Sequence, residues 1–214
     1  MTTKRQPVVV IGGGGHAKVL LHVLERLPQF EVLGYVDPRN AGPILGYPRL
    51  GGDDCLPALA EKMATAAVIG IGKVAATSLR LKMLADLRAL GFSLPIVIAP
   101  TAQVAKEVVL GECTVVMDGA VIQPGCVVGK AGIINSGAIL DHDCMLGDDV
   151  HIAPAAALSG HVCIGDGSMV GIGACVIQGI RVVENCMIGA GAVVTNDCSE
   201  PGTYFGVPAR RSQK

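Results

Sequence analysis

Hydrophobic residues recur at every sixth position through the second half of the chain. The residues at this position are Val104, Leu110, Val116, Ile122, Val128, Ile134, Leu140, Leu146, Ile152, Leu158, Ile164, Val170, Val176, Val182, Ile188 and Val194. A period of six is neither the 3.6 of an α-helix nor the 2 of an isolated strand. It predicts a solenoid in which each hexapeptide forms one short side, three sides close a coil of eighteen residues, and glycines or asparagines supply the corners.

The first hundred residues show a different pattern, in which apolar runs alternate with helical stretches. Strands are expected at residues 8–11, 32–36, 67–71 and 94–98, and helices after the glycines at 12–15, at 56–63 and at 77–90, the last capped by Gly91. This alternation predicts a small, doubly wound, Rossmann-like parallel sheet. We therefore expect an α/β domain over residues 1–100 and an all-β domain over residues 101–214.

Composition narrows the function classes. Half of the residues are hydrophobic but only 3% are aromatic, so aliphatic side chains must fill the core, and a net charge of −1 without a basic run disfavours nucleic-acid binding. No apolar stretch approaches the length of a membrane span, and the early glycines interrupt any signal peptide, which predicts a cytoplasmic protein. The eight cysteines form no CxxC pair. Six of them lie inside the repeat and are interpreted as small buried hydrophobes in a reducing compartment: Cys126, Cys144, Cys163, Cys175, Cys186 and Cys198.

Two features of the first hundred residues favour a nucleotide site. A glycine-rich loop between a strand and a helix can hold an anion on backbone N–H groups. Asp37, at the end of the second strand, could bond a ribose hydroxyl or a base edge. The loop alone would equally suit a nicotinamide dehydrogenase, but the short sheet and the solenoid argue against that class.

The eighteen-residue coil places particular residues together. His142, flanked by Asp141 and Asp143, is the best candidate for a general base. Gly160 follows one coil later, so it should stack about 4.8 Å from His142 with its N–H open to a ligand oxygen. His151 lies half a coil from His142, and the two would meet only across a subunit interface. The sequence thus predicts a site between two protomers.

Two other classes of function stay open. Histidines 142, 151 and 161 could form a zinc site, which would make the chain a metal-dependent lyase or hydrolase. The carboxylates beside His142 favour a base instead, and we expect no metal and interpret His161 as structural. The chain could also be a non-catalytic module that binds a nucleotide sugar. No serine or cysteine lies in a nucleophile motif, so direct attack is the simpler mechanism.

Five motifs carry a resemblance over nearly the whole chain: GGGGH at 12–16, GYVD at 34–37, IGIGK at 69–73, LDHD at 140–143 and GVPAR at 206–210. The chain resembles the hexapeptide-repeat sugar O-acyltransferases of the sialic-acid O-acetyltransferase type, and in particular the PglD-like N-acetyltransferases of nucleotide-linked amino sugars. The resemblance implies a left-handed parallel β-helix, a homotrimer, acetyl-CoA as co-substrate and an N-terminal domain that holds the nucleotide.

The resemblance also implies roles for individual residues. The catalytic set is His142, Asp143, His151 and Gly160, in which Asp143 orients His142 and the Gly160 N–H holds the thioester carbonyl. CoA would contact Gly160, Ile172 and Ala190, and Arg210 and Arg211 are candidates for its phosphates. The nucleotide sugar would contact Gly13, Gly15, His16, Asp37, Gly72 and Lys73.

The predicted function is N-acetylation of a nucleotide-linked 4-amino-4,6-dideoxy sugar in bacterial surface-glycan biosynthesis. A UDP-linked sugar is the first choice. The alternatives within the class are GDP-perosamine N-acetylation and O-acetylation of sialic acid.

Overall fold

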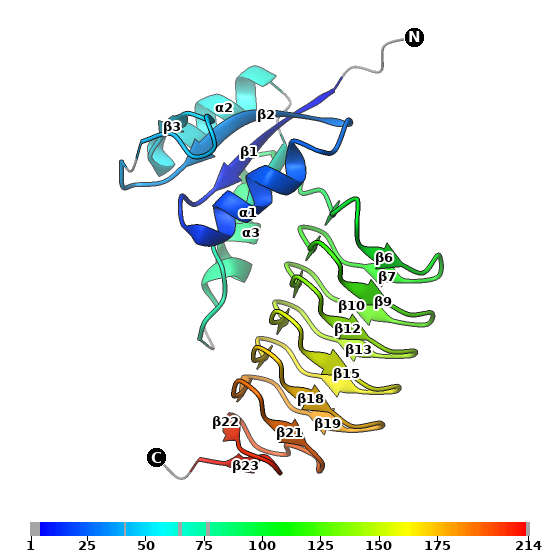
Figure 1. The fold of residues 1–214 in the computed structure, drawn as a ribbon. Coiled ribbons are helices and arrows are strands. Elements are labelled where there is room, and N and C mark those ends of the chain that lie inside the picture. The colour runs from blue at the N-terminus through cyan, green and yellow to red at the C-terminus, as the bar shows by residue number, and fades with distance from the viewer. Residues whose placement is uncertain (1–4, 41, 64–65, 76–77, 213–214) are drawn as a thin grey trace. The chain divides into compact units, whose positions relative to one another are not determined.

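The structure is a computed structural model that describes residues 5–40, 42–63, 66–75 and 78–212. It divides into two compact units (Figure 1), of which the first comprises Met1–Gly72 with Leu79–Pro100 and the second comprises Lys73–Ser78 with Thr101–Lys214. The segment Lys73–Ser78 therefore groups with the second unit, although the expected N-terminal domain included it.

The first unit contains a four-stranded, fully parallel sheet in the order β3-β2-β1-β4. Its strands are β1 (Gln6–Ile11), β2 (Phe30–Val36), β3 (Arg49–Gly51) and β4 (Ala66–Ile69). The apolar run of β1 is buried because strands flank it on both edges and helices cover the sheet. The sheet confirms the Rossmann-like α/β architecture predicted from the sequence.

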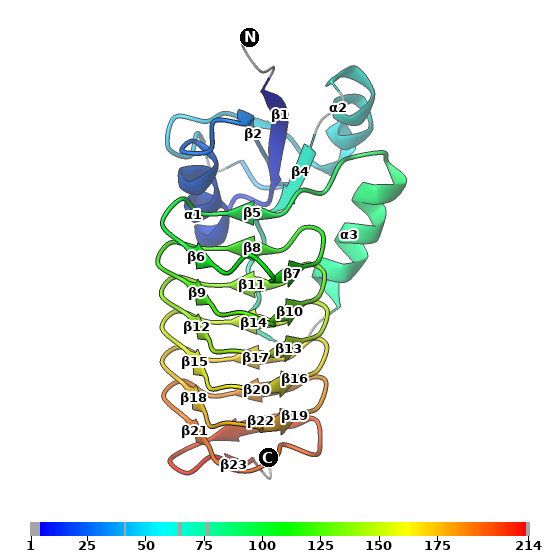
Figure 2. The ribbon, with the colours of Figure 1, turned by 90° about the vertical axis from the view of Figure 1, so that its right-hand side faces the viewer.

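Helices lie on both sides of this sheet. They are α1 (Gly15–Leu24), the one-turn 3₁₀ helix η1 (Asp53–Cys55), α2 (Leu56–Met63) and α3 (Leu79–Ala89). Figure 2 shows α1 on one side and α2 and α3 on the other. Leu20, Leu21 and Leu24 belong to the apolar face that α1 buries. The chain leaves α3 through Gly91 at φ +88°, the C-terminal glycine that the sequence predicted.

Three strand predictions differ from the structure. β4 ends at Ile69 rather than at residue 71, because its neighbour β1 ends at the paired Ile11. Of the strand expected at 94–98, only Val97–Ile98 (β5) is extended, and it is not among the four strands of the sheet. Strand β3 was not predicted, since three residues between loops leave no apolar pattern to detect.

The second unit is a parallel β-helix whose coils each contribute one strand to each of three sheets (Figure 2). One sheet contains β6 (Gln103–Val104), β9 (Val121–Ile122), β12 (Ile139–Leu140), β15 (Ala157–Leu158), β18 (Cys175–Val176) and β21 (Val193–Val194). The second contains β7 (Val109–Leu110), β10 (Val127–Val128), β13 (Met145–Leu146), β16 (Cys163–Ile164) and β19 (Arg181–Val182). The third includes β8 (Val115–Val116), β11 (Ile133–Ile134), β14 (His151–Ile152), β17 (Met169–Val170), β20 (Cys186–Ile188), β22 (Gly202–Phe205) and the antiparallel β23 (Arg210–Arg211).

The strand register confirms the coil of eighteen residues. Val127 pairs with Met145, and Ile139 pairs with Ala157, each exactly one coil apart in the numbering. In the two-residue strands β6 to β19 and in β21, the second residue is the aliphatic one that the period identifies, and it packs in the core of the coil. The predicted solenoid is therefore the observed fold.

Each corner of the coil places one residue in the left-handed region of φ. These residues recur every six positions from Cys113 to Gly191. Glycine fills half of the corners, and the others are Cys113, Ala131, Asp143, Asp149, Ala155, His161 and Asn185, with φ between 53° and 59°. The expectation that glycine or asparagine supplies the corners was too narrow, because the packed coil holds other residues in this conformation as well.

The cysteines of the repeat occupy two environments. Cys126, Cys144, Cys186 and Cys198 belong to the core of the coil, whereas Cys163 is half-buried and Cys175 is exposed, since both occupy the outward-facing position of a strand. The prediction of buried cysteines is wrong for Cys175.

No helix of the described residues has the length and apolar character needed to cross a membrane.

Candidate active site

The glycine loop after β1 is closed by a carboxylate. Asp37 Oδ2 accepts a hydrogen bond from the Gly13 N–H at 2.7 Å, and Asp37 Oδ1 accepts one from the Arg39 N–H at 2.8 Å. Burial alone would raise the pKa of the Asp37 carboxyl, but these hydrogen bonds outweigh it and hold the pKa below its ordinary value. A Cβ on Gly13 would meet the Tyr35 ring at 2.7 Å, so only glycine fits there.

The next two glycines border open space. A Cβ added to Gly14 or Gly15 would meet nothing within 4 Å, and Gly15 begins α1. Gly72 lies beside His16, because a Cβ on Gly72 would be 3.4 Å from the Cβ of His16. The first unit thus gathers most of the predicted nucleotide residues at the carboxyl ends of its parallel strands, next to a helix N-terminus, where anionic ligands bind in folds of this kind.

Lys73 has a different environment from the other predicted nucleotide residues. Its Nζ lies 2.8 Å from Asp149 Oδ2, and both side chains are only 1% exposed. Asp149 occupies a corner of the coil at φ +53°. The Lys73 side chain is therefore engaged in a buried ion pair of the second unit.

His142 and Asp143 form the pair expected of an oriented base. His142 Nδ1 lies 2.8 Å from Asp143 Oδ2, and Asp141 instead accepts a hydrogen bond from the backbone N–H of His142. A carboxylate can only accept this bond, so the proton is on Nδ1 and the lone pair of Nε2 is free to accept a proton. The bond to Asp143, reinforced by the charge of Asp141, raises the pKa of His142 above 6.5.

Gly160 lies directly beside the ring of His142. A Cβ on Gly160 would be 2.5 Å from both Cε1 and Nε2 of His142, and the His161 N–H donates to the His142 carbonyl at 2.9 Å. Among the described residues, nothing accepts a hydrogen bond from the Gly160 N–H. The spacing argument from the sequence thus matches this geometry, in which a basic nitrogen and a backbone donor adjoin one another.

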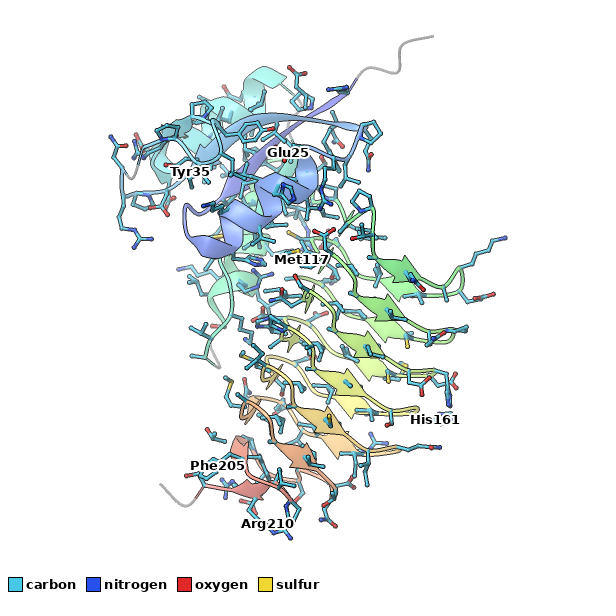
Figure 3. All side chains as sticks on the ribbon, viewed as in Figure 1. Glu25, Tyr35, Met117, His161, Phe205 and Arg210 are labelled. Atoms are coloured by element: carbon cyan, nitrogen blue, oxygen red, sulfur yellow. The ribbon has the colours of Figure 1, made fainter. Side chains whose placement is uncertain are left out.

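His161 completes a cluster that was not predicted from the sequence. Its Nε2 lies 3.6 Å from Asp143 Oδ2, and its ring meets the ring of His142 edge to face with centroids 5.0 Å apart. Figure 3 shows His161 at the outer edge of the coils. His161 follows Asp143 by one coil, so the arithmetic that joined His142 to Gly160 could have found it.

His151 lies on β14, in a different sheet from the strands that flank His142. Its Nδ1 is 2.8 Å from the Lys73 carbonyl and its Nε2 is 3.0 Å from Asn135 Nδ2. Asn135 Oδ1 accepts the Ser136 N–H, so its NH₂ faces the ring and donates to Nε2, which leaves the proton on Nδ1. Asn135 was missed from the sequence, because no spacing rule links residues sixteen apart in this coil.

A groove of about 540 Å³ runs along the sheet that carries His151. Its lining includes His151, Ile172 and Ala190, the last two of which were predicted to bind CoA. Ile172 is 56% exposed, and within the described chain the backbone groups of Ala190 make no hydrogen bond. The groove therefore offers an apolar side chain and free peptide groups to a ligand.

The two predicted phosphate ligands near the C-terminus differ in their availability. Arg211 pairs with Glu200 at 2.7 Å and donates two hydrogen bonds to the Pro201 carbonyl. Arg210 is exposed, and among the described residues its guanidinium donates a hydrogen bond only to the neighbouring Ala209 carbonyl. Of the two, Arg210 (Figure 3) has the guanidinium more accessible to a phosphate.

The potential metal ligands of the described residues gather at one place. Donor atoms of His142, Asp143 and His161 lie within 4.8 Å of one another, whereas His151 is not part of this group. The alternative of a zinc site made from three histidines is therefore not formed within one chain.

Comparison with known proteins gives consistent matches. Residues 7–85 match the family model of the PglD N-terminal domain. PerB from Caulobacter crescentus, in complex with CoA and GDP-perosamine, is 40% identical with a TM-score of 0.89 over 96% of this chain and 97% of that chain. The acetyltransferase domain of PglB from Neisseria gonorrhoeae, in complex with acetyl coenzyme A, is 35% identical with a TM-score of 0.91 over 98% and 100%.

A match of lower sequence identity also covers nearly the whole of both chains. WeeI from Acinetobacter baumannii is 26% identical with a TM-score of 0.79 over 97% of this chain and 100% of that chain. No curated protein matches the sequence.

Proposed function

The chain belongs to the PglD-like family of hexapeptide-repeat sugar acetyltransferases, and from that premise we propose that it transfers the acetyl group of acetyl-CoA to the amino group of a nucleotide-linked 4-amino-4,6-dideoxy sugar. The observation that carries this proposal is that His142 Nε2 lies beside Gly160, whose N–H makes no hydrogen bond among the described residues. The PglB domain is described with acetyl coenzyme A and PerB with CoA and GDP-perosamine, which supports both co-substrates.

The reaction requires a base and a donor for the developing oxyanion. His142 Nε2 accepts a proton from the sugar amine while the amine nitrogen attacks the thioester carbonyl, and the Gly160 N–H donates to the carbonyl oxygen as it gains negative charge. The C–S bond then breaks, and the CoA thiolate takes the proton that His142 holds. Asp143 accepts from Nδ1–H throughout and stabilises the imidazolium.

The two ligands are assigned to different parts of the molecule. The groove beside Ile172 and Ala190 takes the pantetheine arm, and Arg210 contributes a cation for the CoA phosphates. The glycine loop and Asp37 take the nucleotide. The ammonium group of Lys73 is held by Asp149. Lys73 therefore contributes to the site through its backbone carbonyl, which accepts a hydrogen bond from His151.

We propose that the active form is a homotrimer with His142 and His151 contributed by different chains. The outer faces of two sheets carry exposed apolar side chains, among them Val109, Ile139 and Met145, that a neighbouring copy would cover. A cytoplasmic location stays a prediction.

Mixing two inactive variants tests this interface. In trimers assembled from equal amounts of His142→Ala and His151→Ala chains, about one interface in four combines an intact His142 with an intact His151. The whole population of trimers should therefore recover about a quarter of the wild-type rate, because each mixed trimer has one such interface out of three. A site within one chain predicts no recovery.

The acceptor is tested by thiol release from acetyl-CoA with a panel of sugar nucleotides. The panel contains UDP-linked and GDP-linked 4-amino-4,6-dideoxy sugars and free sialic acid. The sequence predicts a UDP-linked sugar, and the likeness to PerB supports GDP-perosamine as the second candidate. Turnover with neither amino sugar would refute the proposal, and EDTA should not lower the rate.

A further inference from the structure

The corner that carries the proposed base has more donor atoms than acetyl transfer uses. His142 and Asp143 lie in one coil and His161 in the next, and donor atoms of the three side chains come within 4.8 Å of one another. All three are exposed to solvent. The proposed mechanism gives no role to His161, although this imidazole faces the carboxylate oxygen that orients His142.

Two distances in this cluster are close to those between ligands of a tetrahedral metal. Zinc bonds to imidazole nitrogen and carboxylate oxygen at about 2.0–2.1 Å, which places neighbouring ligand atoms about 3.3 Å apart. Here Asp143 Oδ2 lies 2.8 Å from His142 Nδ1 and 3.6 Å from His161 Nε2. Each separation differs from the zinc value by a few tenths of an ångström, which exposed side chains can adjust by small rotations.

The donor set also selects among metals. Two imidazoles with one carboxylate suit Zn²⁺ and its neighbours in the first transition row, whereas Mg²⁺ and Ca²⁺ prefer oxygen ligands. The carboxylate of Asp141 adds a second negative charge next to the cluster, since it bonds the His142 N–H. Exposure leaves room for a water molecule as the fourth ligand.

We propose that His142, Asp143 and His161 form a Zn²⁺ site whose occupation switches off acetyl transfer. The predicted inhibition of acetyl transfer rests on the proposed function, whereas the predicted binding of Zn²⁺ does not. Coordination through Nδ1 requires the lone pair of that nitrogen, so the ring proton moves from Nδ1 to Nε2. Nε2–H can no longer accept a proton from the sugar amine, and the metal also takes the carboxylate that would stabilise the imidazolium.

Binding is measured on the full-length protein without any acetyl transfer. Equilibrium dialysis should give one Zn²⁺ per chain, and Co²⁺ should give the visible absorption of a four-coordinate site that Zn²⁺ displaces. His161→Asn should weaken Zn²⁺ binding at least about ten-fold. Asparagine suits this corner, where His161 has φ +59° and where Asn185 holds the same conformation elsewhere in the coil.

Two further variants make the result unambiguous. His161→Gly removes the same ligand and relieves the corner, so it should lose Zn²⁺ binding as His161→Asn does. His22→Gln is the matched control, because His22 is also an exposed histidine paired with a carboxylate, Glu25, at 2.8 Å. It should bind Zn²⁺ as the wild type does. Equal Zn²⁺ affinity in the wild type and both His161 variants would overturn the proposal.

Inhibition is then measured by thioester loss at 232 nm, with Zn²⁺ added and afterwards removed by EDTA. The wild type should lose its activity when Zn²⁺ occupies the site and regain it with EDTA, whereas Mg²⁺ at the same concentration should have no effect. His161→Asn should transfer acetyl groups at the wild-type rate in EDTA and need at least about ten-fold more Zn²⁺ for inhibition. Zn²⁺ binding without inhibition would refute the switch while leaving the proposed reaction intact, and absence of turnover in EDTA would refute the proposed reaction alone.

Discussion

Gly160→Ala is a small change that should disable the proposed base without disturbing the coil. The added Cβ would lie 2.5 Å from Cε1 and Nε2 of His142, and ordinary van der Waals contact begins at 3.4 Å. The imidazole must therefore retreat by about 0.9 Å. A displacement of about 1 Å in a reacting group can cost about 10²-fold in rate, so kcat should fall by about that factor.

The fold should tolerate this substitution. Gly160 does not lie in the left-handed region of φ, and the equivalent position one coil later carries Gln178, so a side chain there is compatible with the solenoid. The melting temperature is expected to stay close to that of the wild type. Loss of activity would then reflect the position of His142 rather than unfolding.

The assay is steady-state thiol release, combined with a double-mutant cycle. In a His142→Ala background the clash is gone, so Gly160→Ala should reduce the remaining rate far less than it does in the wild type. A wild-type kcat for Gly160→Ala would refute the geometry of the base. Equal losses in both backgrounds would show that Gly160 acts independently of His142.

Three other outcomes follow from the contacts of single residues. The hydrogen bond to Asp143 raises the pKa of His142, so kcat/KM should fall as the pH drops through a value above 6.5. Asp143→Asn should move this fall in kcat/KM to lower pH, and an unchanged pH profile would contradict the assignment of His142 as the base. Lys73→Met removes the cation facing a buried carboxylate, so denaturant titration should show a loss of about 3–5 kcal/mol in the free energy of unfolding, most of it recovered when Asp149→Asn, which removes the unpaired charge and suits the φ of +53°, is added. Asp37→Ala frees the glycine loop and should raise KM for the sugar nucleotide while kcat stays constant; a change confined to kcat would place the nucleotide elsewhere.

The periodicity of the sequence was enough to place the proposed catalytic pair. Strands in the coil repeat every eighteen residues, so the position of Gly160 beside His142 follows from counting. The same count puts Asp143 beside Gly125 and His161, and neither neighbour was predicted from the sequence. A Cβ on Gly125 would meet Asp143 Oδ1 at 2.3 Å, so this carboxylate also depends on a glycine one coil away.

Other contacts were not accessible to such counting. Lys73 precedes the repeat and reaches Asp149 across 76 positions, and its carbonyl bonds to His151 across 78. In the first unit, the closure of the glycine loop by Asp37 depends on how β1 and β2 lie in register. Sequence motifs could mark these residues as candidate functional residues, but the motifs could not identify the partners of these residues.

The division between the two sources of information has a physical basis. A solenoid is nearly one-dimensional, because each coil contacts mainly its neighbours, and distance along the chain then translates directly into distance in space. The sequence by itself therefore determined the coil, its core and the pair formed by His142 and Gly160. Only the tertiary structure decided the partners of Lys73 and His151, because those contacts join segments whose separation in the chain follows no repeat.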